Sequence, residues 1–358
     1  LGVSYTGLGA LVGLGFVGMG ILSPAGGVLA DRFGPRRMIA LGLVFSGLAG
    51  LARAYAPSFE VFAVGSLGTG LAQALVYPNL PKVVQSGVPP KDHRIATSVY
   101  SSSLIAGPLA GVALTGSVLF EVFTGWRGAL AAWAGLDLGI AALWWVVAQR
   151  HGALADPARP PDRTTGGESW HWPDIRVLLG LFLALGTAFF TVITWLPAYL
   201  QSLGYSRADA GFLTALMEVV GFGAAYGLPK VAATSRAHRW TAAIYVGFAA
   251  CVGLVLLGNP LTILLAIMGF GITIEGLFAY LLLVQLGFAG TRAGTLGGLL
   301  FTMSYVGAVV GPWAFGILRD STGGFAAGFG ALALMGLLAA ALGLRLPQAA
   351  KRVSPAVA

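Results

Sequence analysis

The sequence predicts an all-α protein that crosses a lipid bilayer many times, and three observations lead to this prediction. Hydrophobic residues make up 57% of the 358 residues and charged residues only 9%, whereas soluble domains carry about 25% charged residues. The apolar residues gather into eleven runs, each near the roughly 20 residues that a membrane helix needs. Most lysines and arginines fall in alternate connections between these runs, as cytoplasmic loops of membrane proteins require.

The eleven runs are expected to be helices, because they lack the alternation of apolar and polar residues that is typical of barrel strands. In chain order they are Tyr5–Ala30, Met38–Tyr55, Val61–Pro81, Ala96–Leu119, Ala129–Ala148, Val177–Leu200, Gly211–Leu228, Thr241–Leu257, Leu261–Leu286, Ala293–Leu318 and Phe325–Leu342. The 54 glycines fit this assignment, since small residues let membrane helices pack closely.

The distribution of basic residues predicts how the chain is oriented. Of the 21 lysines and arginines, all but Arg53, Arg127, Arg207 and Arg319 lie on one side of the predicted spans. This side is expected to be cytoplasmic, which makes the chain a multi-pass inner (plasma) membrane protein with a cytoplasmic C-terminus. An odd number of spans then places Leu1 outside. We expect a twelve-span plan whose first helix this chain lacks, and a genuine eleven-span protein is the alternative.

The polar segment 150–176 divides the runs into two groups. We expect an N-terminal bundle of five spans over residues 1–149, a cytoplasmic linker over 150–176, a C-terminal bundle of six spans over 177–346 and a cytoplasmic tail over 347–358. Gly107-Pro108 in the fourth run recurs as Gly311-Pro312 in the tenth. This offset of six spans indicates parallel repeats, related by an axis along the membrane normal.

The first basic loop carries a motif. Gly27 is followed after three residues by Asp31-Arg32, then by Gly34 and the pair Arg36-Arg37. This pattern resembles the signature loop of the major facilitator superfamily. The resemblance implies two pseudo-symmetric helical bundles and secondary active transport of a small solute by alternating access.

In that family the acidic and basic residues of this loop latch the two halves together on the cytoplasmic side. Here the latch would comprise Gly27, Asp31, Arg32, Gly34, Arg36 and Arg37. Asp31 would lie near the N-terminus of the tenth span, close to Thr291 or Thr295, where the helix dipole favours a negative charge. The alternative is that the arginines only bind anionic lipid.

Within the superfamily, the text Trp195-Leu-Pro-Ala-Tyr199-Leu-Gln201-Ser-Leu-Gly204 resembles the cyanate-permease-like branch. Anion carriers of the superfamily hold their substrates with Arg or Lys inside the helices. No Lys or Arg lies in the middle of any predicted span, so a small strong anion would lack a charge partner unless a helix outside this chain supplies one.

Three acidic residues fall inside the predicted spans: Asp137, Glu218 and Glu275. Ionisable groups in the bilayer are costly and usually face a cavity or a partner. Glu275 and Glu218 lie on helices that line the central cavity in the family plan, and we expect them to be the proton-coupling residues. Asp137 lies on a peripheral helix, where a structural role is favoured. Both glutamates could instead be protonated structural hydrogen-bonding groups.

The solute-binding site is expected near the membrane midplane, between the two halves. The expected substrate-binding residues are Tyr77, Tyr100, Thr191, Trp195, Glu275 and Tyr305. The four histidines lie in loops without the paired spacing of a metal site. We therefore expect no metal, no cofactor and no enzymatic activity. The expected partners are a small-molecule solute and the lipid bilayer, without nucleic acid, and the chain is expected to be a monomer. The alternative function is a non-transporting membrane sensor or scaffold on the same fold.

Overall fold

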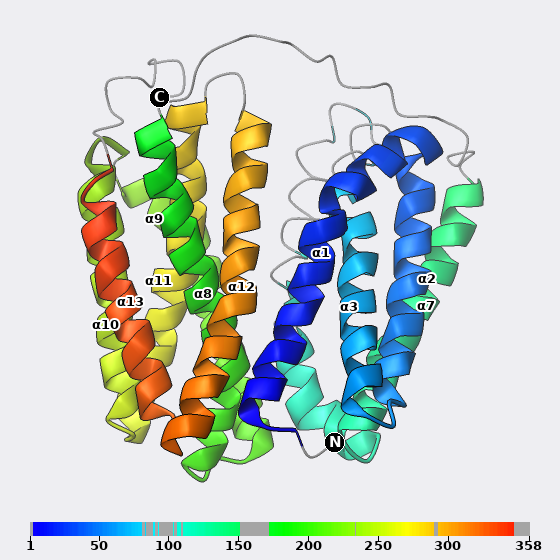
Figure 1. Cartoon of the computed structure of the whole chain (residues 1–358), viewed down its shortest axis with the longest axis horizontal. Coiled ribbons are helices and arrows are strands. Elements are labelled where there is room, and N and C mark those ends of the chain that lie inside the picture. The colour runs from blue at the N-terminus through cyan, green and yellow to red at the C-terminus, as the bar shows by residue number, and fades with distance from the viewer. Residues whose placement is uncertain are drawn as a thin grey trace. The chain divides into compact units, whose positions relative to one another are not determined.

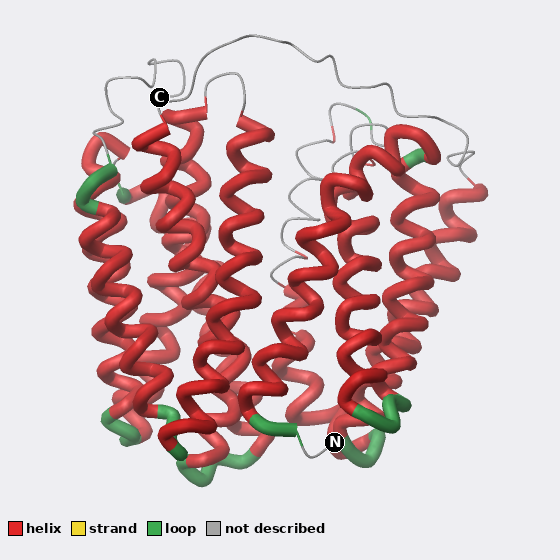
Figure 2. Tube along the Cα trace, in the orientation of Figure 1, coloured by secondary structure: helices red, strands yellow, loops and turns green. Residues whose placement is uncertain are grey.

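The structure is a computed structural model that describes residues 3–80, 110–150, 172–232, 234–289 and 293–346, with a few positions between 83 and 108. Every regular element in these ranges is a helix, as Figure 2 shows. The predicted all-α class is therefore confirmed.

The long helices stand side by side within each half of the chain, as Figure 1 shows. They are α1 (Tyr5–Phe33), α2 (Pro35–Ala54), α3 (Phe59–Val76), α7 (Trp126–Arg150), α8 (Trp172–Ser202), α9 (Arg207–Val231), α10 (Ala237–Leu256), α11 (Pro260–Ala289), α12 (Ala293–Thr322) and α13 (Ala326–Gly343). Short helical pieces complete the described residues: η1 (Tyr77–Asn79), the π-helical η3 (Thr115–Leu119), α6 (Phe120–Val122) and η4 (Thr234–Arg236).

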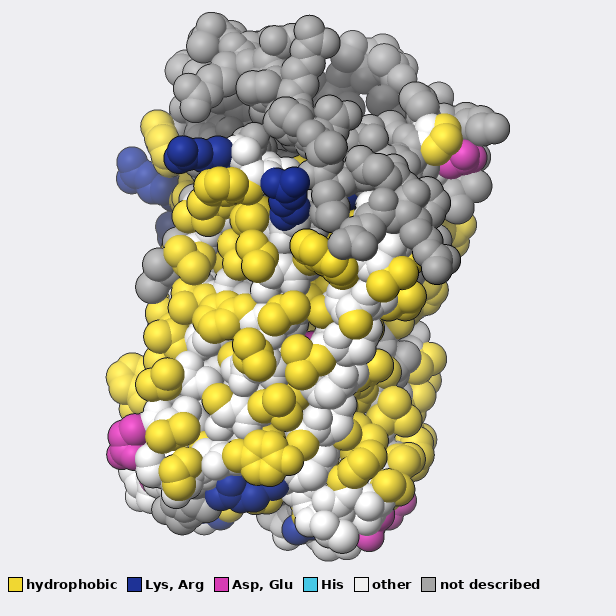
Figure 3. Space-filling view, turned by 90° about the vertical axis from the view of Figure 1, so that its right-hand side faces the viewer, with side chains coloured by type: hydrophobic (Ala, Val, Ile, Leu, Met, Phe, Trp, Pro, Cys, Tyr) yellow, Lys and Arg dark blue, Asp and Glu magenta, His cyan; other side chains and the backbone are white. Residues whose placement is uncertain are grey.

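Nine helices of the described part are long and apolar enough to cross a membrane, and α1 adds the shorter apolar stretch Tyr5–Gly20. Of the predicted span Ala96–Leu119, residues 110–119 are helical, and most of residues 96–109 lie outside the described part. Figure 3 shows hydrophobic side chains over the middle of one face, with Lys and Arg side chains toward both ends. Exposed apolar residues recur at helical spacing, for example Leu41, Phe45 and Leu48 on α2. This pattern is that of a lipid-facing surface, so the chain is a multi-pass membrane protein.

One predicted span differs from the structure at its end. The run Val61–Pro81 was expected to be a single helix, but α3 ends at Val76 and continues as the 3₁₀ turn Tyr77–Asn79. Pro78 explains the change, because proline has no N–H to donate to the preceding helical turn.

By their contacts, the residues form two compact units. Unit 1 comprises residues 1–3 and 10–164, and unit 2 comprises residues 4–9 and 165–358. In unit 1, α2 packs against both α3 and α7. Two side chains of α7 attach it to α2: Arg127 Nη1 donates to the carbonyl oxygens of Ala54 (3.1 Å) and Ala56 (2.8 Å), and Trp144 Nε1 donates to the Arg36 carbonyl (3.1 Å).

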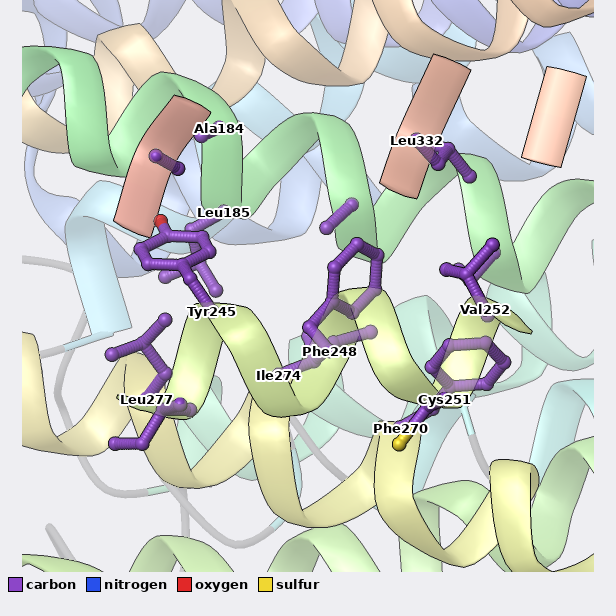
Figure 4. Packing of buried hydrophobic residues seen from close by; sticks show 14 of the residues in the cluster. Ala184, Leu185, Tyr245, Phe248, Cys251, Val252, Phe270, Ile274, Leu277 and Leu332 are labelled. Carbon is purple, nitrogen blue, oxygen red and sulfur yellow. The ribbon is translucent and has the colours of Figure 1, made fainter. Parts of the chain in front are cut away.

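Unit 2 contains a large hydrophobic core built by α8, α10, α11 and α13. Figure 4 shows Tyr245, Phe248 and Val252 of α10 among side chains of α8, α11 and α13. The Tyr245 hydroxyl is fully buried and donates to the Leu181 carbonyl of α8 (2.6 Å), so its polar atom is satisfied. The other close helix pairs of unit 2 are α9 with α11 and α8 with α12. These two seams hold four of the predicted site residues: Thr191, Trp195, Glu218 and Glu275.

Candidate transport site

Glu218 lies in the fourth turn of α9. This helix begins at a well-formed cap, in which the Ser206 Oγ accepts from the Asp209 N–H (3.1 Å), as serine does at helix N-termini. The Glu218 side chain is only 2% exposed. Its Oε1 atom is buried and has no hydrogen-bond partner among the described residues, which is costly for a polar atom.

Glu275 lies on α11 and is 9% exposed. Its side chain packs directly over Gly221 of α9, because a Cβ atom placed on Gly221 would lie 2.5 Å from Glu275 Cγ. Gly221 follows Glu218 by three residues, so the two share one face of α9. One turn before Glu275, Gly271 contacts the Met217 carbonyl oxygen. The structure therefore brings the two predicted carboxyl groups to one helix seam, α9–α11.

Thr191 and Trp195 lie one turn apart on α8 and face α12. Trp195 Nε1 donates to the Pro312 carbonyl (3.1 Å), and a Cβ on Gly311 would meet Thr191 Oγ1. Both side chains are almost completely buried, and Thr191 Oγ1 has no partner among the described residues. The structure brings these two residues together at the α8–α12 seam.

The other predicted solute-binding residues are more scattered. Tyr305 lies on α12, with its ring centroid 6.5 Å from that of Phe301. Tyr77 belongs to unit 1, where its side chain is 38% exposed. Tyr100 lies outside the described residues. A solute-binding role for this set remains a prediction.

The profile of one protein family, the Major Facilitator Superfamily, matches residues 1–312 of this sequence. The chain belongs to the Major Facilitator Superfamily. Its membership confirms the resemblance of the Gly27–Arg37 loop to the signature of this superfamily. The predicted fold is confirmed with it: two pseudo-symmetric bundles of membrane helices.

Known superfamily members are similar to this chain over most of its length. The cyanate transport protein CynX of Escherichia coli (strain K12) is 26% identical over 353 residues, covering 94% of this chain and 87% of that protein. The 2-nitroimidazole transporter of the same organism is 27% identical over 345 residues, covering 94% of this chain and 85% of that protein. The similarity to the first protein confirms the resemblance to the cyanate-permease-like branch.

Solved structures of superfamily transporters share the fold. A bacterial homologue of the human lysosomal transporter Spinster has a TM-score of 0.81 at 15% identity, covering 99% of this chain and 92% of that chain. A D-xylose–proton symporter has a TM-score of 0.72 at 17% identity, covering 97% of this chain and 90% of that chain. Superfamily members move small solutes across membranes and are not enzymes, so this chain is a transporter. Nothing supports the predicted alternative of a sensor or scaffold.

The superfamily signature loop is described only in part. Gly34 adopts a positive φ of 91° between α1 and α2, a conformation that favours glycine. Arg32 and Arg37 are exposed, and Arg32 Cζ lies 5.4 Å from the centroid of the Phe33 ring. The surroundings of Gly27, the side chain of Asp31 and the side chains of residues 291–295, where α12 begins, lie outside the described part. The predicted latch therefore stays a prediction.

Sequence reasoning did not foresee a polar pocket inside unit 1, between α2, α3 and α7. The Ser46 hydroxyl donates to Asp137 Oδ2 (2.7 Å), and Arg53, Thr69 and Gln73 also line the pocket. These residues fall on one face of each helix, so helical spacing was the available signal. The hydrogen bond to Ser46 agrees with the structural role that was favoured for Asp137. In the described part of the chain, no three His, Cys, Asp or Glu residues cluster as metal ligands would.

Proposed function

We propose that this transporter couples the movement of a small organic acid to that of a proton, with Glu275 and Glu218 as the proton-binding groups. The observation that carries the proposal is the burial of two carboxyl groups in one seam, α9–α11. Neither has a Lys or Arg partner among the described residues. An unpaired carboxylate is very costly in a low-dielectric interior, so each group is expected to be neutral when buried and to release its proton when its surroundings become wet.

The substrate class is proposed from the names of related proteins. Besides cyanate, these names include galactarate and D-glucarate, sulfoacetate, hexuronate and gallate. All are anions near neutral pH, whereas 2-nitroimidazole is an uncharged heterocycle. No described span of this chain carries a Lys or Arg at its middle. Movement of an anion together with a proton lowers the net charge that must enter the low-dielectric path, which compensates for the missing cation.

The proposed topology places the C-terminus in the cytoplasm of a cell whose inner (plasma) membrane holds the chain as a monomer. The support is the excess of Lys and Arg on one side of the spans. The proposed bundles cover residues 1–149 and 177–346, joined by the linker 150–176 and followed by the tail 347–358. The proposed latch joins Asp31 to the start of α12 on the cytoplasmic side.

Transport assays in liposomes test the proposal. Purified protein is reconstituted, and uptake of gallate, D-glucarate, sulfoacetate, cyanate and 2-nitroimidazole is measured with and without an inward proton gradient. We expect the gradient to drive accumulation of at least one of the acids. Glu275→Gln is then expected to abolish gradient-driven accumulation of that acid while solute exchange without a gradient continues, because exchange does not require proton release. Glu218→Gln should act in the same direction.

Asp137→Asn provides the matched control. It also removes an acidic group from a membrane span, but Asp137 lies in unit 1 and its carboxylate already accepts a hydrogen bond from Ser46. We expect this variant to keep its proton dependence. Proton-driven accumulation that survives in both glutamate variants would exclude the α9–α11 pair from coupling. Gradient-driven accumulation of 2-nitroimidazole alone would refute the organic-acid class.

A further inference from the structure

Besides the polar pocket of unit 1, the structure contains a cavity within unit 2, away from the α9–α11 seam. Its volume is about 360 Å³, and it lies where α8, α10 and α12 end and α13 begins. Tyr199 and Ser202 of α8, Leu256 of α10 and Arg319 of α12 line it, together with Phe325 and Ala326. No acidic residue lines the cavity, so Arg319 brings it a positive charge.

The charge of Arg319 is held in place but not neutralised. Arg319 Cζ lies 4.7 Å from the ring centroids of both Tyr5 and Phe325, contacts that orient a guanidinium group without cancelling its charge. Arg319 Nε is buried and has no hydrogen-bond partner among the described residues. A buried N–H of this kind is costly unless a ligand or water accepts from it.

The adjacent carboxylate is already engaged elsewhere. Asp320 Oδ2 accepts from the backbone N–H (2.7 Å) and the hydroxyl (2.6 Å) of Thr6, and Oδ1 accepts from the Tyr5 N–H (3.2 Å). These bonds satisfy the free N–H groups in the first turn of α1. Because Asp320 binds this turn, it leaves Arg319 available to an external anion.

The two hydroxyl groups that line the cavity already use their hydrogens, so Arg319 is the side chain that is left to donate to a ligand. The Tyr199 hydroxyl donates to the Val255 carbonyl (3.0 Å), and the Ser202 hydroxyl donates to the Tyr199 carbonyl (2.6 Å). The first turn of α13 has no side-chain cap, so its free N–H groups add positive potential at the same end. Arg319 is thus the main donor, and the Leu256, Phe325 and Ala326 side chains form an apolar wall.

We propose that this cavity binds an oxyanion that carries a small apolar group, with its carboxylate or phosphate oxygens on the Arg319 guanidinium. A planar guanidinium suits two parallel hydrogen bonds to such a group. Two sources offer this chemistry: a free carboxylate, or the phosphate of an anionic lipid at the end of the bundle. The site does not depend on the proposed proton coupling, because none of its residues belongs to the α9–α11 seam.

The full chain in a neutral detergent allows both sources to be tested. In the first arm, thermal unfolding is followed by tryptophan fluorescence with benzoate or with benzamide, its uncharged counterpart. Benzoate should raise the apparent unfolding temperature by several degrees, as mass action requires of a ligand that binds only the folded state. Benzamide should not. In the second arm, native mass spectrometry measures retention of phosphatidylglycerol against phosphatidylcholine.

Arg319→Gln should lose the benzoate response or the retained phosphatidylglycerol. Ala326→Trp should do the same with Arg319 intact, because it fills the cavity, and this keeps the test decisive if Arg319→Gln folds poorly. Arg127→Gln is the matched control: this arginine also lies over an aromatic ring, at 4.5 Å from that of Trp126, but its Nη1 already donates to two carbonyls. Its response should equal that of the unmodified chain.

A benzoate response that both Arg319→Gln and Ala326→Trp abolish identifies a site for free carboxylates. Retention of phosphatidylglycerol that the same variants abolish identifies a lipid phosphate site. The absence of both signals, or signals that persist in both variants, would overturn the proposal.

Discussion

The two glycine-lined seams of unit 2, α9–α11 and α8–α12, bring their helices together in similar ways but enclose different chemistry. In α9–α11, Gly221 and Gly271 allow close approach, and the seam buries the carboxyl groups of Glu218 and Glu275. In α8–α12, Gly311 allows close approach, and the seam buries a neutral hydroxyl and an indole from Thr191 and Trp195. The indole is satisfied by the Pro312 carbonyl, whereas the neutral Thr191 hydroxyl and one carboxyl oxygen of Glu218 have no partner within the described residues.

The difference between neutral and acidic buried groups suggests a packing role for α8–α12 and a functional role for α9–α11. A satisfied neutral group can hold a seam closed in every state of the transporter, whereas an unsatisfied carboxyl destabilises its seam unless a proton or a change of surroundings compensates. The two seams also differ in the atoms that a side chain added at their glycines would meet. A Cβ on Gly271 would meet backbone atoms of α9, whereas a Cβ on Gly311 would first meet the Thr191 side chain. Substitutions in the two seams should therefore have unequal effects.

The largest effect is expected from Gly271→Ala. The new methyl group would collide with the Met217 carbonyl oxygen and lie 2.9 Å from the Gly221 nitrogen, and neither backbone atom can rotate away. Overpacking of this kind typically costs about 1–3 kcal/mol. Thermal unfolding in detergent, followed by tryptophan fluorescence, should show a clearly lowered midpoint. Gly223→Ala on α9 is the control, because a Cβ there meets nothing within 4 Å. Equal midpoints for the two variants would contradict the tight packing of α9–α11.

A smaller loss is expected from Gly311→Ala in the α8–α12 seam. Here the new methyl group meets Thr191 Oγ1 and lies 2.9 Å from Thr187 Cγ2, and both are side-chain atoms. The double variant Gly311→Ala/Thr191→Ala should recover part of the lost stability, as coupled neighbours do in a double-mutant cycle. The same unfolding measurement applies. If the stability losses of Gly311→Ala and Thr191→Ala simply add in the double variant, the Thr191 side chain does not obstruct the new methyl group, and the contrast between the two seams disappears.

The smallest effect on stability is expected from Thr191→Val. The Thr191 hydroxyl is buried without a partner among the described residues, so replacing it with a methyl group of similar shape removes no hydrogen bond and should not lower the unfolding free energy. Uptake of the transported acid in liposomes then reports on the predicted solute-binding role. A raised KM with unchanged stability would support that role, and unchanged kinetics would assign Thr191 to packing alone.

The sequence was sufficient to predict the nine long apolar helices of the described part, because hydropathy marks the part of each helix that lies in lipid. It placed the ends less well. The run Val177–Leu200 marks only the middle of α8, which extends from Trp172 to Ser202. Helical hydrogen bonds continue into polar turns where hydropathy falls, so helix length and lipid thickness need not agree.

The candidate site was predictable one residue at a time but not as an arrangement. An acidic residue in an apolar run is conspicuous, and this identified Glu218 and Glu275 separately. Their meeting depends on the register of α9 against α11, which is set by Gly221 and Gly271. Among 54 glycines, the sequence does not indicate which ones face a neighbouring helix. Arg319 was missed for a related reason, since its cavity forms only when the turn after α12 places Phe325 beside it.

The two side chains that attach α7 to α2 are separated by nearly the thickness of the bilayer hydrocarbon. Arg127 and Trp144 are seventeen residues apart on α7, or about 26 Å at the helical rise per residue, close to the roughly 30 Å of bilayer hydrocarbon. Arg127 donates to carbonyls at the C-terminal end of α2, and Trp144 donates to a carbonyl at its N-terminal end. Sliding α7 along α2 by a single turn would break the hydrogen bonds of both side chains at once, so these contacts oppose sliding between the two helices.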